Sequence, residues 1–361
     1  MLLAQMGSLN ALEQGRHNNF WQKWLGRGLP SADTIGRVFS LIDLESIRFS
    51  IHHVYSRLKR NKALKKTHGF QVLILDGHEH ASSYLRCCLG CLRRRIHTRE
   101  EDRIQYYHRN VVAMLSGEQF PVLLDAEEQK RGEDEVGCAI RLSQRILKHY
   151  ARAFSVVVTD GLYLEAPFFN LFLKHGKHII AVLKDERREL MEDAKGLFQH
   201  EEPWVQIEGK TKRLIWDIEG FTSWESLGRP IRVVRSLEER TLCRQRTGKE
   251  EIETSEWMWA TTLSKEEAST ETIVKLGHSR WLVENKALNE MVTYWHADHV
   301  YKHHPNAIAA FWLTLMFVLN IFRAFVYLNI KPCLRHRHSD LYFTRLIFAA
   351  LYDGTYQKIP P

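Results

Sequence analysis

Two short apolar runs that lead directly into an aspartate constrain the fold more than any other feature of this sequence. Residues 72–75 are all large and aliphatic and lead into Asp76, and residues 156–159, three valines and a threonine, lead into Asp160. Runs of this kind are typical of strands that are buried on both faces. A sheet buried on both faces needs helices to cover it, so the pattern predicts an α/β fold.

The rest of the chain alternates between strand and helix patterns in a way that supports this fold class. Strands are predicted at residues 71–76, 106–115, 121–128, 155–160 and 178–184, and helices at 133–149, 166–174 and 187–198. Three strands followed by helix–strand repeats predict a mixed sheet that begins antiparallel and becomes parallel. Two of these strands, 71–76 and 155–160, are expected to end in Asp76 and Asp160.

The periodicity also divides the chain into five segments. Residues 1–68 are predicted to form an N-terminal helical module, whose basic run at 57–66 is either a solvated helix face, the favoured interpretation, or a contact with DNA phosphates. Residues 199–256 are predicted to form a β-rich insertion between Gly and Pro turns. The insertion is followed by a strand at 257–263 and by a helix that begins at 264 and breaks at Gly277. Next come a second helix from 278 and an apolar helix at 306–328. The segments are the module at 1–68, a first stretch of the core at 69–198, the insertion at 199–256, a second stretch of the core at 257–330 and a basic tail at 331–361.

Composition excludes several classes of protein. Of 361 residues, 51 are Lys or Arg and 43 are Asp or Glu, which gives a net charge of +8 and permits an anionic partner such as nucleic acid. Six scattered cysteines and an N-terminus without a basic, then apolar, region predict a reduced, cytoplasmic protein. The most apolar run, residues 307–319, is shorter than the roughly 20 residues that span a bilayer, so we expect a buried helix and no membrane.

An aspartate at the end of a buried strand is well placed to bind a ligand or take part in catalysis, because ligands of open α/β sheets bind outside the carboxyl ends of the strands. An uncompensated carboxylate at such a place is costly, and a hard divalent cation compensates it. The alternative is that Asp76 and Asp160 only form the Asp-Gly turn after each strand. Because two such acids follow two parallel apolar strands, we weigh the metal-binding interpretation and the turn interpretation about equally.

Three blocks of sequence carry a family resemblance that favours the metal interpretation: VLILDGHEH at 72–80, VVVTDGLYLEAPFFN at 156–170 and HSRWLVENKALNEM at 278–291. In order and spacing they resemble bacterial insertion-sequence transposases that have a DDE catalytic domain of ribonuclease-H-like fold. The resemblance implies that Asp76, Asp160 and Glu284 are the catalytic residues and bind two Mg²⁺ or Mn²⁺ ions. The separations of 84 and 124 residues fit the group that carries a β-strand insertion before the glutamate.

The resemblance also implies residues that contact DNA. Arg280 precedes Glu284 by four residues, a spacing that places both on one helix face and Arg280 beside a phosphate. The family often has Tyr three residues before this Arg and Lys seven after the Glu, where this chain has Gly277 and Met291. Lys286 or His278 is the substitute expected for the missing Lys, and Glu290 is the acid that competes with Glu284.

Other side chains have both a functional and a structural interpretation. His78, with His80 beside it, either contacts the scissile phosphate or is hydrogen-bonded within its loop. Trp216 and Trp224 either stack on a flipped base or belong to the core of the insertion. The remaining candidates for phosphate contact, with a solvated helix start as the alternative, are Lys184, Arg187 and Arg188.

Cys88-x-x-Cys91 has the spacing of a zinc ligand pair, with Cys87 and His97 nearby. A second pair at a suitable distance is missing from the sequence. Reduced, buried cysteines are therefore favoured over structural zinc.

The function implied is that of a DNA transposase that hydrolyses phosphodiester bonds at transposon ends and transfers the freed strand into target DNA. The expected partners are the terminal inverted repeats, the target DNA and a second copy of the chain on paired ends, in the bacterial cytoplasm at the nucleoid. Two alternatives remain: a metal-dependent nuclease on the same fold, and an inactive DNA-binding remnant of a transposase.

Overall fold

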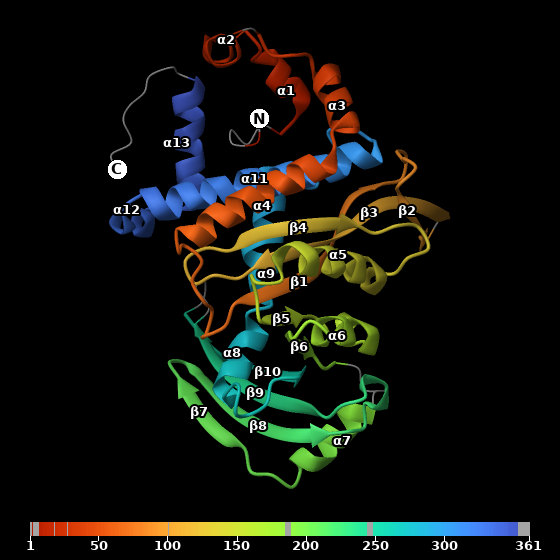
Figure 1. Cartoon of the computed structure of the whole chain (residues 1–361), viewed down its shortest axis with the longest axis vertical. Helices are drawn as coiled ribbons and strands as arrows, with labels where there is room; N and C mark the ends of the chain where they lie inside the picture. The colour runs from red at the N-terminus through yellow and green to blue at the C-terminus, as the bar shows by residue number, and fades with distance from the viewer. Residues whose placement is uncertain are drawn as a thin grey trace. The chain divides into compact units, whose positions relative to one another are not determined.

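The computed structural model describes residue 2 and residues 7–17, 19–26, 28–99, 101–184, 189–243 and 248–352. The chain forms two compact units, each built from segments that are distant in the sequence (Figure 1). The first unit comprises Met1–Lys65, Asp76–His149 and Leu282–Pro361, and the second comprises Lys66–Leu75 and Tyr150–Trp281.

The first unit begins with four helices: α1 (Leu9–Gln14), α2 (Asn19–Leu25), α3 (Ala32–Leu41) and α4 (Leu44–Arg60). Ser31 caps α3, since its Oγ accepts a hydrogen bond from the Thr34 N–H, and Asp43 caps α4 in the same way. The apolar stripe of α4, which includes Ile47, Ile51 and Tyr55, is buried. The predicted helical N-terminal segment is therefore present.

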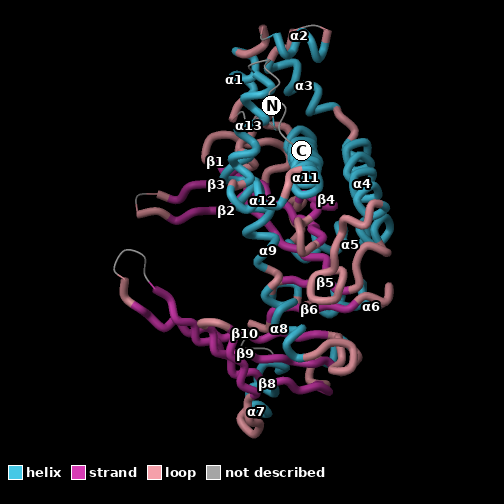
Figure 2. The backbone as a smooth tube through the Cα atoms, turned by 90° about the vertical axis from the view of Figure 1, so that its left-hand side faces the viewer, coloured by secondary structure: helices cyan, strands magenta, loops and turns pink. Residues whose placement is uncertain are grey.

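The apolar helix near the C-terminus, α11 (Pro305–Asn329), is the central helix of this unit. It packs against α3, α4 and strand β4 (Val122–Glu128), and α4 and α11 lie side by side in Figures 1 and 2. Asn320 is fully buried there and hydrogen-bonds the backbone N–H and carbonyl of Leu123, at 2.9 and 2.7 Å. By length and apolar composition alone α11 is able to cross a membrane, but the buried core helices of soluble proteins share these properties, and 61% of its most apolar stretch is buried. The predicted buried helix is confirmed.

The segment predicted as a basic tail contains two helices, α12 (Pro332–Arg337) and α13 (Asp340–Tyr352). α12 has no helical pattern in the sequence, because it is only six residues long, is rich in His and Arg and has no buried residue. Residues 353–361 of this segment lie outside the described residues.

The strands of the first unit are β2 (Leu92–His97), β3 (Asp102–Leu115), β4 and the portion of β1 (Val72–Ser83) that begins at Asp76. β3 pairs antiparallel with both β2 and β4. Helix α5 (Glu135–Tyr150) follows β4, as predicted. Strand β2 was not predicted, because three consecutive arginines in LRRRIH hide its alternating pattern of exposed and half-buried side chains.

The second unit holds the remaining strands. β5 (Val156–Thr159) and β6 (His178–Val182) are short and almost fully buried, and α6 (Ala166–Leu173) connects them. After α7 (Glu189–Phe198) come β7 (Trp204–Glu208), β8 (Thr211–Phe221), β9 (Ile231–Cys243) and β10 (Glu250–Thr261), all antiparallel to their neighbours. Helix α8 (Thr270–His278) packs against β6 and β9. The β-rich character predicted for residues 199–256 is confirmed, although β10 continues through residue 256 without a break.

The strands form one mixed sheet in the order β2-β3-β1-β5-β6-β10-β9-β8-β7, with β4 paired to β3. β1, β5 and β6 are parallel neighbours, with Ile74 opposite Val158 and Val158 opposite Ile180. The predicted α/β fold class is thus confirmed as a mixed sheet with helices, antiparallel at the β3–β4 side and parallel through β1, β5 and β6.

Candidate functional site

Asp160 lies immediately after β5 and is surrounded by cationic and hydrogen-bond-donating groups. Its Oδ1 accepts hydrogen bonds from the Gly161 N–H at 2.7 Å and from Lys184 Nζ at 2.8 Å. Burial acts to raise the pKa of Asp160, but Lys184, the Gly161 N–H and the charge of Arg280 together hold that pKa below its ordinary value. Asp160 is therefore a carboxylate at neutral pH.

Gly161 has a steric reason to be glycine. A Cβ at this position would lie 2.8 Å from the carbonyl oxygen of Val182 in β6. The Asp-Gly pair thus allows the chain to turn close against β6 while the carboxylate of Asp160 accepts the N–H of the glycine that follows it.

Asp76 differs from the expectation, because the strand does not end there. It is the fifth residue of the twelve-residue β1, at the point where the burial changes from fully buried to half-buried. Its Oδ1 accepts a hydrogen bond from the Gly77 N–H at 3.0 Å. A Cβ on Gly77 would lie 2.4 Å from the Glu135 carboxyl group, so this glycine allows α5 to approach the strand and does not form a turn.

The strand register relates the two aspartates. Ile74 of β1 and Val158 of β5 are paired in parallel, and each aspartate follows its paired residue by two positions. Asp76 and Asp160 thus each follow a residue of a paired, parallel stretch of β1 and β5.

Glu284 begins a π-helical segment, Glu284–Leu288, that lies between α9 (Trp281–Val283) and α10 (Asn289–Trp295). Single turns of π-helix inside a helix occur frequently at functional sites. The side chain is half-buried, and among the described residues it makes no hydrogen bond or ion pair. The carboxylate of Glu284 is therefore available to a ligand.

Glu290, the competing acid, has a structural role. Its Oε2 accepts a hydrogen bond at 2.9 Å from Arg323 of α11, whose side chain is 2% exposed. Arg323 also donates to the backbone carbonyls of Lys286 and Pro121. Glu290 is thus the counter-ion of a buried arginine, which sequence reasoning missed because Arg323 stands in an apolar helix.

Arg280 lies in the turn between α8 and α9, so the predicted helix break falls at residues 279–280 and not at Gly277. It is buried, 5% exposed, and its guanidinium stacks on the Trp281 ring at 4.1 Å. α8 continues through Gly277, where a Cβ would lie 2.3 Å from Nε1 of the buried Trp259. The packing of Trp259 against α8 therefore requires glycine at the position where the resembling family often has Tyr.

His278, proposed as a substitute cation, hydrogen-bonds Glu238 through Nε2 at 2.7 Å. Lys286 is exposed on the π-helical segment. Lys184 is about half exposed and is engaged by Asp160. Arg187 and Arg188 lie outside the described residues.

The two other candidates for DNA contact have protein partners. His78 Nε2 lies 3.1 Å from Asp298 Oδ1. Trp216 donates its indole N–H to the Glu201 carbonyl at 3.0 Å and carries the Arg235 guanidinium over its ring at 4.6 Å. Trp224 is half-buried and packs edge-on against Phe169 of α6.

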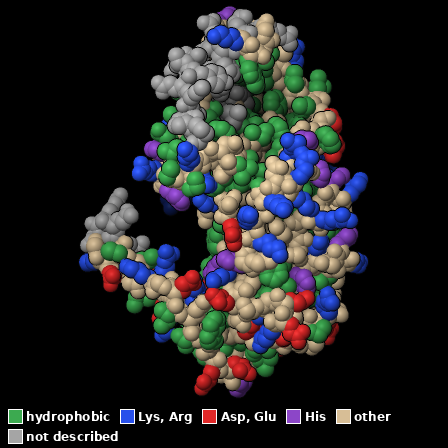
Figure 3. Space-filling view, turned by 60° about the vertical axis from the view of Figure 1, so that its left-hand side comes forward, with side chains coloured by type: hydrophobic (Ala, Val, Ile, Leu, Met, Phe, Trp, Pro, Cys, Tyr) green, Lys and Arg blue, Asp and Glu red, His purple; other side chains and the backbone are tan. Residues whose placement is uncertain are grey.

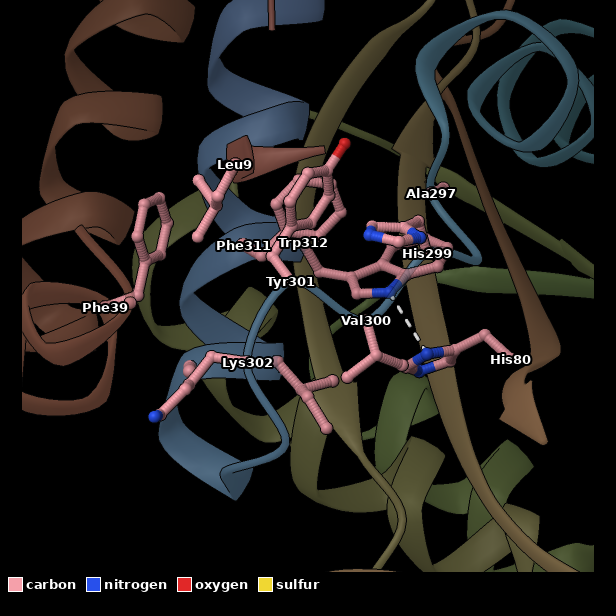
Figure 4. A pocket seen from close by; sticks show the side chains of 13 residues that line it. Leu9, Phe39, His80, Ala297, His299, Val300, Tyr301, Lys302, Phe311 and Trp312 are labelled. Atoms are coloured by element: carbon pink, nitrogen blue, oxygen red, sulfur yellow. Dashed lines mark hydrogen bonds between the residues drawn. The ribbon is translucent and has the colours of Figure 1, made fainter. Parts of the chain in front are cut away.

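A mostly apolar pocket of the first unit is lined by none of these acids (Figure 4). Its walls are aromatic and aliphatic side chains of α1, α3, α11 and residues 297–302, among them Leu9, Phe39 and Phe311. Trp312 donates its indole N–H to Nδ1 of His80 there, at 3.3 Å. The pocket is a packing feature of the helical layer.

Comparisons with known proteins identify a family for this chain. One solved structure that is similar, the piggyBac transposase synaptic complex with hairpin DNA, has 10% identity and a TM-score of 0.46, over 79% of this chain and 52% of that chain. This chain thus spans about half the length of that transposase chain. No protein of the curated set matches. A family model described as "Transposase DDE domain" matches residues 67–321, a range that contains Asp76, Asp160 and Glu284. The chain belongs to the family of transposase DDE domains.

Proposed function

We propose that this chain is a DNA transposase that cuts phosphodiester bonds at the ends of a mobile element and joins the freed 3′ end to target DNA. The catalytic carboxylates are Asp76, Asp160 and Glu284. The observation that carries the proposal is the match to the transposase DDE domain over residues 67–321, in which Asp76 and Asp160 follow paired residues of the parallel strands β1 and β5.

The donor set suits two Mg²⁺ or Mn²⁺ ions. Three carboxylates offer hard oxygen ligands, Asp160 is ionised, and Glu284 has no competing partner among the described residues. The Lys184 ammonium on Asp160 already occupies a position that suits a cation. When bound, such ions stabilise charge on the attacking and leaving oxygens of an in-line displacement at phosphorus.

The roles proposed for the remaining residues follow from their exposure. Lys184 pairs with Asp160 in the free protein. Its side chain is about half exposed and is long enough to contact a DNA phosphate instead. Lys286 is exposed and contacts phosphate directly. Arg280 is buried, and its positive charge lowers the pKa of Asp160 in the free protein. We propose that His78 contacts the region of the scissile phosphate and that Trp216 stacks on a displaced base.

The experiment that tests the function uses the full chain and a labelled duplex that carries the inverted repeats flanking its gene. We expect 3′-end cleavage and joined products with Mg²⁺ or Mn²⁺ and neither with EDTA. Cleavage without joining would instead identify a metal-dependent nuclease. Binding of the repeats without cleavage would identify an inactive remnant.

The N-terminal helical segment is the region best suited by charge to hold DNA. Residues 1–68 contain 11 Lys or Arg and 4 Asp or Glu, a net charge of +7, whereas residues 199–256 contain 10 and 12, a net charge of −2. On the face in Figure 3 most Asp and Glu side chains lie in the lower region, where Figure 1 shows β7–β10 and α7. We therefore propose that residues 1–68, acting in the cytoplasm in a homodimer on paired ends, supply most of the phosphate contacts.

The exposed end of α4 tests this assignment. Replacing Arg57, Arg60 and Lys62 by alanine is expected to weaken DNA binding on all sequences, because fewer phosphates are neutralised. The slope of log K against log salt is expected to fall by about one unit for each phosphate that the variant leaves without a cation. Fluorescence anisotropy over a salt series measures the slope.

A matched control removes three exposed cations from the β-rich segment, Lys210, Lys212 and Arg240. It is expected to leave the slope unchanged. If the control lowers the slope as much as the α4 variant does, the N-terminal assignment is wrong.

A further inference from the structure

A cluster of two cysteines and a histidine lies in the first unit, in the connection from β1 to β2 and on β3. Cys88 and Cys91 stand before β2, and His108 extends from β3. Each of the two Sγ atoms is 3.3 Å from His108 Nε2, and the sulfurs are 3.6 Å apart. All three side chains are half-buried or buried, and both cysteines are free thiols.

These separations match three corners of a zinc tetrahedron. With Zn–S of about 2.3 Å and Zn–N of about 2.0 Å, tetrahedral angles place two sulfurs about 3.8 Å apart and a sulfur about 3.5 Å from a nitrogen. The observed edges of 3.6, 3.3 and 3.3 Å are within about 0.2 Å of these values. Among the described residues this is the one group of three or more such side chains whose donor atoms converge in this way.

The surroundings of the cluster hold the ligands in place. Arg131 donates to the backbone carbonyls of both cysteines, Nε to Cys91 at 2.8 Å and a terminal nitrogen to Cys88 at 3.2 Å. The Cys88 N–H points at the Cys91 sulfur, 3.1 Å away. A Cβ on Gly90 would lie 3.2 Å from Pro305 and 3.4 Å from His108, so glycine lets the turn approach the histidine. The turn is therefore fixed before any ion binds.

The second ring nitrogen of His108, Nδ1, lies near a carboxylate, as the second nitrogen of a metal-bound histidine often does. His108 Nδ1 lies 3.5 Å from Glu128 Oε2, and Glu128 also lies 3.3 Å from Nε2 of the buried His80. A carboxylate near the remote nitrogen is typical of metal-bound histidines, and here Nε2 faces the two sulfurs. His97, which lies near the cysteines in the sequence, is instead paired with Asp102 at 2.7 Å.

We propose that Cys88, Cys91 and His108 bind a zinc ion through three protein ligands, with solvent in the fourth position. Thiolate and imidazole donors in a tetrahedral arrangement select zinc over the Mg²⁺ of the proposed catalytic acids. The ion ties the β1–β2 connection to β3. This site holds its metal whether or not the proposed transposase activity exists.

Metal content of the full chain, purified under reducing conditions, is the first measurement. We expect about one zinc per chain by mass spectrometry, and a loss of zinc when Cys88 and Cys91 are both replaced by serine. Cys243→Ser with Cys333→Ser, two exposed cysteines outside the cluster, is the control and retains the zinc. Asp160→Asn also retains it, which separates this site from the catalytic acids.

Cobalt spectroscopy keeps the proposal testable if the cysteine variants do not fold. Wild-type protein stripped with a chelator is titrated with Co²⁺, and we expect visible bands of tetrahedral cobalt together with sulfur-to-cobalt charge transfer. His108→Cys is expected to keep the site and, with three thiolates in place of two, to raise the charge-transfer intensity about 1.5-fold. Zinc-free wild-type protein that also fails to give tetrahedral cobalt bands would overturn the proposal.

Discussion

Replacing Asp160 by asparagine is expected to abolish metal-dependent cleavage while leaving DNA binding unchanged. Asparagine keeps an Oδ1 that accepts the Gly161 N–H and the Lys184 ammonium, so the local fold is retained. It removes the negative charge that a divalent ion needs. Because such ions contribute several kcal/mol to phosphoryl transfer, we expect cleavage to fall roughly a thousand-fold or more. Single-turnover cleavage of the inverted-repeat duplex measures the rate, and anisotropy measures binding.

Asp193→Asn on the exposed face of α7 is the matched control and is expected to cleave at the wild-type rate. Asp76→Asn and Glu284→Gln are expected to behave like Asp160→Asn. Wild-type rates in the Asp160 variant would remove this residue from the catalytic site.

Replacing Arg323 by methionine is expected to cost more stability than any of the other single substitutions proposed for this chain. The guanidinium is buried, pairs with Glu290 and donates to the Lys286 carbonyl within the π-helical segment. Removing one member of a buried ion pair leaves an uncompensated charge and typically costs about 3–5 kcal/mol. Urea unfolding followed by tryptophan fluorescence measures the loss. Arg337→Met, an exposed arginine of α12, is the control and is expected to change stability little.

The double variant Arg323→Met, Glu290→Met tests whether the pair explains the loss. Since the second change removes the stranded carboxylate, we expect some of the stability to return. If the two single losses simply add, the ion pair is not the cause, and the Lys286 carbonyl is the contact that matters.

Much of the fold could be predicted because its central strands are strongly apolar. β5 and β6 are short valine- and isoleucine-rich runs with no other plausible structure, and α11 is apolar on nearly every face. β2 could not be predicted, because its three consecutive arginines look alike in the sequence, whereas in the strand Arg93 and Arg95 are exposed and Arg94 pairs with Glu79. The end of β1 was misplaced for a related reason. Asp76-Gly77 has the pattern of a turn, whereas here glycine gives room to Glu135.

The site was predictable only as a set of acids with a known spacing. The family resemblance implied Glu284 rather than Glu290, and in the structure Glu290 is paired with Arg323. The partners that lie far away in the chain were not predictable, since Asp298 reaches His78 over 220 residues and His108 reaches Cys88 over 20. Arg280 and Glu284 were expected on one continuous helix face, but the turn at 279–280 and the π-helical segment change that geometry.

Strand β10 has a consequence for how the β-rich segment relates to the strands it follows. One end of this strand, from Glu250 to Glu256, pairs only with β9, while its other end pairs with β6 through Trp259, Ala260 and Thr261. The β-rich segment is therefore not joined to β6 by a flexible linker, because the one continuous strand β10 pairs with both β9 and β6. A ligand that rigidifies the outer half of the β9–β10 ribbon also rigidifies the strand that carries Trp259, the residue against which Gly277 is packed.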